Sequence, residues 1–228
     1  MTGGREQMLD SIRRGLGRGP LGEAGKAAIA ARLDVHRAGI IPARTRRDPA
    51  GLIDLFVELA VGAVATVERL DSPRRIPIAV ADYLAAHDLP GDLVMAPDPW
   101  LDRLLWAERP KLKLRPGRAL ATDTTGIARA FAGVAETGTL AMVSSETSPS
   151  TISFVPDTHI VVLGASRIVA SCEEVFARLR GEAGAAFMPR SLHLITGPSR
   201  TKDIEQRIVL GAHGPRRLHI LLVDGAET

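Results

Sequence analysis

The feature that most constrains the fold of this chain is a series of short apolar runs separated by segments with helical spacing. The clearest run, residues 159–164, is apolar and β-branched, and residues 171–180 after it suit a helix with Ser171 as N-cap. The runs that we expect to form strands are residues 63–67, 93–96, 139–143, 159–164, 192–196 and 218–223. Short apolar strands that alternate with helices predict an α/β fold, with a mostly parallel sheet covered by helices on both faces.

Helical spacing predicts the elements between these strands. The expected helices are residues 5–16, 24–37, 52–59, 73–87, 99–107 and 201–210. Leu112 and Leu114 indicate an additional edge strand. Because ligands of open α/β sheets bind beyond the carboxyl ends of the strands, we expect the chemistry in loops that follow strands.

Charge separates the first part of the chain from the rest. The 228 residues carry +3, yet residues 1–50 alone carry +5 and the remainder −2. We therefore expect a basic, helical leader over residues 1–48 and an α/β domain over residues 49–228. The leader has no aromatic side chain to stack on bases and no DNA-binding motif, which favours a solvated arm or a subunit contact over nucleic-acid binding.

The only cysteine, Cys172, excludes several kinds of site on this chain. An iron–sulfur cluster, a cysteine-rich zinc site and a disulfide framework each need more ligands or partners. No nicotinamide or flavin signature, Walker loop or zinc-protease motif occurs, so the sequence predicts no metal and identifies no cofactor. It also shows neither a secretory signal nor an apolar run of about 18 residues, and we expect a cytoplasmic protein.

The first motif with chemical potential follows the expected strand at residues 192–196. It reads Gly197, Pro198, Ser199, Arg200, Thr201, Lys202, Asp203, Ile204 and Glu205. If it opens a helix, its exposed N–H groups form an anion site, to which Arg200 and Lys202 add positive charge. Asp203 and Glu205 can equally satisfy the helix dipole themselves, which would make this an ordinary capped helix.

The second motif runs into the strand expected at residues 139–143. It reads Glu136, Thr137, Gly138 and Thr139. A carboxylate beside two hydroxyls can serve as a base, a nucleophile or a ligand-orienting group, or it can be a solvated turn acid. After this strand, residues 144–150 are rich in hydroxyls, which suits either a polar ligand or a mobile loop.

The third motif, residues 156–159, reads Pro-Asp-Thr-His and leads into the most apolar strand. His159 can be a group that titrates near neutral pH or a structural residue at the strand start. Residues 211–215, Gly-Ala-His-Gly-Pro, form a turn before the last strand.

Taken in this order, the three motifs and the 211–215 turn resemble the LUD domain family, and above all its small members without iron–sulfur clusters. The resemblance is strong over about residues 120–225 and weaker over residues 50–120. Its most specific element is the Gly-Pro-Ser string at Gly197 with the Asp-Ile-Glu string at Asp203. Lys202 departs from the family pattern, which often has a small residue there.

This resemblance implies a Rossmann-like α/β fold of the kind found in glucosamine-6-phosphate deaminases, ribose-5-phosphate isomerases and coenzyme A transferases. It also implies a role in oxidising L-lactate to pyruvate with partner proteins that carry the iron–sulfur centres, in agreement with the single cysteine. The site it implies has Glu136 as a catalytic or orienting residue and His159 as a further candidate. The implied anion-binding residues are Thr137, Gly138, Thr139, Gly197, Pro198, Ser199, Arg200, Thr201, Asp203 and Glu205.

Two other functions fit the same residues. One is a stand-alone enzyme acting on a sugar phosphate or an acyl thioester, by analogy of fold. The other is a non-catalytic module that binds a small anion. The sequence does not decide whether this chain is itself an enzyme.

Overall fold

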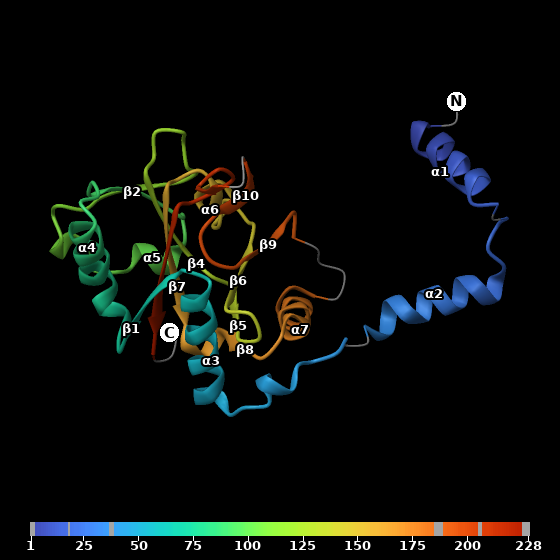
Figure 1. Ribbon diagram of the computed structural model, residues 1–228, viewed down its shortest axis with the longest axis horizontal. Helices are drawn as coiled ribbons and strands as arrows, with labels where there is room; N and C mark the ends of the chain where they lie inside the picture. Colours follow the sequence, from blue (N-terminus) through green and yellow to red (C-terminus); the bar gives the residue numbers. More distant parts are fainter. Residues whose placement is uncertain (1–2, 18, 37–38, 185–188, 205–206, 225–228) are drawn as a thin grey trace. The chain divides into compact units, whose positions relative to one another are not determined.

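The computed structural model describes residues 3–17, 19–36, 39–184, 189–204 and 207–224 (Figure 1). The chain divides into two compact units, Met1–Ile40 and Ile41–Thr228. In the first unit the described residues form the helices α1 (Gly4–Gly15) and α2 (Glu23–Val35), as expected from their spacing, and neither helix has a buried residue. The predicted domain start at residue 49 lies within the second unit, where the helix α3 (Pro49–Gly62) begins.

A parallel sheet of six described strands, in the order β1-β12-β7-β4-β2-β3, forms the centre of the second unit. The strands are β1 (Thr66–Leu70), β2 (Asp92–Met95), β3 (Lys113–Pro116), β4 (Thr125–Arg129), β7 (Thr158–Gly164) and β12 (Arg217–Val223). Each neighbouring pair is parallel, and β3 lies at an edge, as Leu112 and Leu114 indicated. The predicted α/β fold with a mostly parallel sheet is confirmed.

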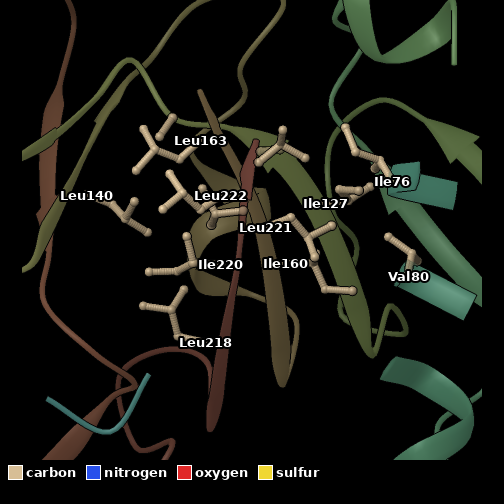
Figure 2. Packing of buried hydrophobic residues seen from close by; sticks show 14 of the residues in the cluster. Ile76, Val80, Ile127, Leu140, Ile160, Leu163, Leu218, Ile220, Leu221 and Leu222 are labelled. Atoms are coloured by element: carbon tan, nitrogen blue, oxygen red, sulfur yellow. The ribbon is translucent and has the colours of Figure 1, made fainter. Parts of the chain in front are cut away.

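The core lies on both faces of the adjacent strands β7 and β12. All seven residues of β7 are buried, as are the last six of β12 (Figure 2). Helix α4 (Ile76–Ala86) contributes Ile76 and Val80 to this core, and α3 contributes Phe56. Asp48 is the N-cap of α3, because its carboxylate accepts a hydrogen bond from the Gly51 N–H (2.9 Å).

A second, mixed sheet packs on the first. Its described strands, in the order β8-β5-β6-β9, are β5 (Ala132–Val134), β6 (Thr139–Val143), β8 (Ile168–Val169) and β9 (Leu192–Ile195). Gly133 of β5 allows the close approach, because a Cβ there would lie 2.7 Å from Leu163 of β7 and 3.1 Å from Phe56 of α3. In Figure 1, α4 lies on one side of the parallel sheet, and the second sheet with α7 (Cys172–Ala183) lies on the other.

Six further short elements belong to the described part of the second unit. They are the helices α5 (Pro99–Asp102) and α6 (Thr151–Phe154) and the 3-10 turns η1 (Ala43–Thr45), η2 (Pro73–Arg75), η3 (Trp106–Glu108) and η4 (Ala165–Arg167). The helix expected over residues 99–107 is thus broken in two. The strand expected at residues 63–67 begins later, at Thr66, because α3 continues to Gly62 and Val64 turns the chain with a φ of 69°.

The expected helix at residues 201–210 is wrong. This segment forms an antiparallel pair, β10 (Arg200–Ile204) and β11 (Arg207–Leu210). Four of its residues, Thr201, Ile204, Ile208 and Val209, are β-branched, and side chains of this kind favour strands over helices. The helix was expected because charged residues are common in the first turn of a helix, and several lie between these β-branched residues.

In the part of the chain that the structure describes, no helix combines the length and the apolar character needed to cross a bilayer.

Acid should weaken the folded state through His159 of β7. Its side chain is fully buried, neither ring nitrogen has a hydrogen-bond partner among the described residues, and burial lowers the pKa of the imidazole to about 4. Because the unfolded chain takes up this proton near pH 6.5 and the folded chain only near pH 4, stability falls as the pH decreases between these values. From pH 7 to pH 5 we expect a loss of about 2 kcal/mol from this residue alone.

Urea unfolding at the two pH values measures this loss. The variant His159→Leu should show a smaller difference between pH 7 and pH 5 than the wild type, whatever its absolute stability. The exposed His36 provides the control, because His36→Gln should leave the difference unchanged. An equal pH dependence in wild type and His159→Leu would contradict the assignment.

Candidate functional site

Three neighbouring strands of the parallel sheet end beside a small cavity. The cavity has a volume of about 220 Å³ and is lined by Asp98 after β2, by Arg129 at the end of β4 and by Arg167 after β7. The loop after β6 closes it with Ser145, Thr147 and Ser148. This is the carboxyl edge of the sheet, where ligands of α/β proteins bind.

Arg129 is held in one orientation by two contacts. Its Nε donates to Asp98 Oδ2 (2.7 Å), and its guanidinium carbon lies 4.8 Å from the centre of the Trp100 ring. The other carboxylate oxygen of Asp98 accepts the backbone N–H of Trp100 (2.8 Å) and so caps α5, which carries this ring. Asp98 therefore holds the guanidinium and the start of α5 together, so that the cation is positioned before any ligand arrives.

Arg167, in the turn η4 that follows the neighbouring strand β7, is held in a similar way. Its Nη1 donates to Glu182 Oε1 of α7 (2.6 Å), and its guanidinium carbon lies 5.7 Å from the centre of the Phe131 ring. Its side chain is 28% exposed and that of Arg129 is 27% exposed. Two half-buried guanidinium groups thus lie beside the cavity, and each has a carboxylate partner.

The hydroxyl-rich loop after β6 is ordered by its own hydrogen bonds. The N–H of Ser145 donates to Ser148 O (3.1 Å), and the N–H of Ser148 donates back to Ser145 O (3.3 Å). The hydroxyls of Ser145 and Thr147 lie 3.0 Å apart. Ser145 also lines a second, larger cavity of about 480 Å³. Of the two interpretations of this loop, the geometry favours a ligand-facing segment.

Glu136 has a structural partner. Its Oε1 accepts the N–H of Cys172 at the start of α7 (2.8 Å), and its backbone carbonyl accepts Arg44 Nη2 (2.7 Å). The side chain of Ser171, expected as the cap, makes no capping bond, so the Glu136 carboxylate takes that place. A carboxylate at a helix N-terminus is favoured by the helix dipole. The catalytic role of Glu136 stays a prediction.

Two of the predicted segments meet at the end of α3. The hydroxyl of Thr139 lies 2.7 Å from that of Thr137 and 2.6 Å from that of Thr196. Gly138 and Gly197 have φ values of 64° and 70°, and a Cβ at these positions would lie 2.3 Å from Ala60 N and 2.1 Å from Ala63 O respectively. Only glycine tolerates both the positive φ and the close backbone contact at these two positions. The glycines therefore allow the loops around residues 138 and 197 to pack against the end of α3.

Ser199 and Arg200 bind neighbouring backbone. The hydroxyl of Ser199 accepts the N–H of His213 (3.2 Å), its carbonyl accepts the N–H of Gly211 (2.9 Å), and Arg200 Nη2 donates to Ala63 O (3.1 Å). Pro198 is buried beside them. Because the segment after Ser199 is a strand and not a helix, the helix N-terminus on which the predicted anion site depended does not exist there.

The remaining predicted residues lie in three places. Thr201 and Asp203 belong to β10, where the side chains are outside the described part of the structure, and Glu205 lies outside the described residues altogether. His159 is buried inside the sheet, away from solvent, which favours its structural interpretation. Asp157 beside it accepts the N–H groups of Arg216 and Arg217 through its carbonyl (2.8 and 3.1 Å), which joins the third motif to the last strand.

Sequence reasoning missed the arginines of the small cavity. Arg167 comes three residues after a strand that was predicted, so the rule on strand ends could have found it. Arg129 ends β4, which was not predicted because Gly126 weakens the strand pattern, although that glycine is needed where a Cβ would lie 2.9 Å from Ile152. Among the described residues, no group of three or more His, Cys, Asp or Glu side chains could hold a metal.

The contact between Glu136 and Cys172 makes the thiol a poor nucleophile. Burial and the neighbouring Glu136 carboxylate both raise the pKa of Cys172. Replacing Glu136 by Gln removes the charge but keeps an oxygen for the Cys172 N–H, so Glu136→Gln should lower the thiol pKa and speed its alkylation by iodoacetamide at pH 8. Glu182→Gln, the same charge change at the far end of α7, is the control and should leave the rate unchanged. Equal rates for wild type and Glu136→Gln would contradict this account.

Comparisons with known proteins agree with the fold and identify the family. An uncharacterised protein of Neisseria meningitidis is 39% identical over 99 residues, 43% of this chain and 41% of that protein. Lactate utilization protein C of Bacillus subtilis is 34% identical over 92 residues, 40% of this chain and 38% of that protein. The aligned part thus spans about two fifths of the length of these curated relatives.

A crystal structure of a DUF162 family protein from Deinococcus radiodurans has the same fold. It superimposes with a TM-score of 0.55 at 18% identity and covers 78% of this chain and 99% of that one. The family model of the LUD domain matches residues 100–223, more than half of the chain. This stretch contains the arginines of the small cavity, the hydroxyl loop and all three predicted motifs. The chain belongs to the LUD domain family.

Proposed function

We propose that this chain is a component of an L-lactate utilisation system and that its small cavity binds the carboxylate of lactate or pyruvate. The observation that carries the proposal is the pair of guanidinium groups, Arg129 and Arg167, at adjacent strand ends beside the hydroxyls of Ser145 and Thr147. Several relatives that are 31–34% identical over part of their length are called lactate utilization protein C, which supports the choice of acid.

The size and chemistry of the cavity suit a short organic acid. Its 220 Å³ is below the ~300–1,000 Å³ typical of clefts for drug-sized ligands, so the cavity favours a short acid over a nucleotide. Guanidinium groups donate to both oxygens of a carboxylate in one plane, and hydroxyls suit the 2-hydroxy or 2-oxo group beside it. The aromatic rings beside the arginines restrict the motion of these side chains. Less conformational entropy is therefore lost when a ligand binds.

Oxidation of L-lactate to pyruvate releases two electrons and two protons, which an acceptor must take up. With Cys172 as its only cysteine, this chain holds too few ligands for an iron–sulfur cluster. The proposal therefore places the iron–sulfur centres on partner proteins, and this chain contributes the binding of the acid. The predicted segments around Glu136 and Gly197 form an alternative anion site in the same proposal, and the binding experiment below separates the two.

Growth tests the role in the cell. A strain without this protein, and without a redundant lactate oxidase, should fail to grow on L-lactate as sole carbon source but should grow on pyruvate. Wild-type protein should restore growth, and the double variant Arg129→Gln/Arg167→Gln should not. Normal growth of the deletion strain on L-lactate would refute the proposed role.

Direct binding tests the site. Pyruvate and lactate, titrated into the purified chain by calorimetry, should bind at least tenfold more weakly to Arg167→Gln than to wild type, because one of two guanidinium donors is lost. Arg69→Gln is the matched control, since Arg69 also lies near the end of a strand and pairs with a carboxylate, Asp54 (3.1 Å), but belongs to β1 at the edge of the sheet. If Glu136→Gln abolishes binding while Arg167→Gln does not, the alternative site is the correct one.

A further inference from the structure

The larger cavity is a second place where polar groups converge. It has a volume of about 480 Å³ and shares Ser145 with the small cavity. Arg118 reaches it from the loop after β3, and Arg190 from the segment before β9. Its other polar lining residues are Ser144, Ser145, Glu146, Ser150, Thr151 and Ser191. We infer that this cavity binds a phosphate group, separately from the acid in the small cavity.

Two hydroxyls of the lining are set up as donors. The oxygen of Ser144 accepts the N–H of Ser191 (2.9 Å), and the oxygen of Thr151 accepts the N–H of Ala119 (3.1 Å). A hydroxyl has one proton to donate, and in neither case does a described residue accept it. Backbone bonds thus fix the oxygens and leave the O–H protons for a ligand that accepts hydrogen bonds.

The two arginines differ from those of the small cavity in their surroundings. Arg129 and Arg167 are paired with Asp98 and Glu182, whereas no described carboxylate lies within ion-pair distance of Arg118 or Arg190. Glu146 also lines the larger cavity, so its three charged residues sum to a formal charge of +1. The cavity therefore combines donors with a net positive charge.

The arrangement of these donors suits phosphate better than carboxylate. The donors come from three separate segments, after β3, after β6 and before β9, and so they approach from different directions. A phosphate has three terminal oxygens that accept hydrogen bonds in three dimensions, whereas the two oxygens of a carboxylate lie in one plane. The cavity has about twice the volume of its neighbour, which leaves room for more than the phosphate itself. This inference does not depend on which acid the small cavity takes.

Pyrophosphate and inorganic phosphate are the probes, titrated into the full chain by calorimetry at constant ionic strength. The wild type should bind pyrophosphate at one site per chain, and the double variant Arg118→Gln/Arg190→Gln should bind it at least tenfold more weakly. Arg75→Gln is the matched control: Arg75 is exposed and follows β1, at the opposite edge of the sheet from β3, and its loss removes a positive charge without touching the cavity. Circular dichroism checks that each variant is folded.

Three results would overturn the inference: no pyrophosphate binding by the wild type, equal weakening in Arg75→Gln, and loss of binding in Arg167→Gln with Arg118→Gln/Arg190→Gln unaffected. Pyruvate binding, measured on the same variants, distinguishes the two sites. If Arg118→Gln/Arg190→Gln loses pyrophosphate but keeps pyruvate, the larger cavity is a separate phosphate site. If the wild type binds pyrophosphate but not pyruvate, the proposal for the small cavity fails and this inference stands.

Discussion

Strand β7 is paired on both sides, with β4 and with β12, and every one of its seven residues is buried. A strand in this position can carry no charged group along its length, because an unpaired charge inside the sheet would cost several kcal/mol. The charged residues of the two paired strands therefore lie at strand ends, as Arg217 does at the start of β12. Arg129 is the last residue of β4, and Arg167 follows β7 after the turn η4. Since paired strands lie about 4.8 Å apart, residues at their ends meet.

The arginines of the small cavity and those of the larger cavity are held in different ways, and this difference affects how each cavity binds an anion. Each guanidinium of the small cavity has a carboxylate partner and an aromatic ring beside it, so its geometry is set in advance and selects ligands by shape. The arginines of the larger cavity are exposed and lack such partners among the described residues. Because these guanidinium groups are exposed, their attraction for an anion is more easily screened by salt.

The sequence predicted the fold better than the site. The apolar strands β6, β7 and β12 and the helices around them were found, because continuous apolar runs are typical of parallel strands buried on both faces. Strands β4 and β5 were missed because Gly126 and Gly133 interrupt the pattern, and those glycines are explained only by the side chains packed against them. The β10–β11 pair was predicted to be a helix because its charged residues resembled a helix start, whereas its β-branched residues favour strands.

The predicted motifs around Thr139 and Gly197 lie at the opposite end of β6 from the small cavity. Thr139 and Val143 are the two ends of β6, about 13 Å apart at the rise of an extended strand. Val143 lines the small cavity, whereas Thr139 binds Thr196 next to Gly197, where two glycines with positive φ rest on α3. A motif made of glycines, hydroxyls and a capping carboxylate looks catalytic in a sequence. Here its hydrogen bonds and close contacts are made within the protein, and they fix the second sheet against α3, so that the far end of β6 can present the hydroxyl loop to the arginines.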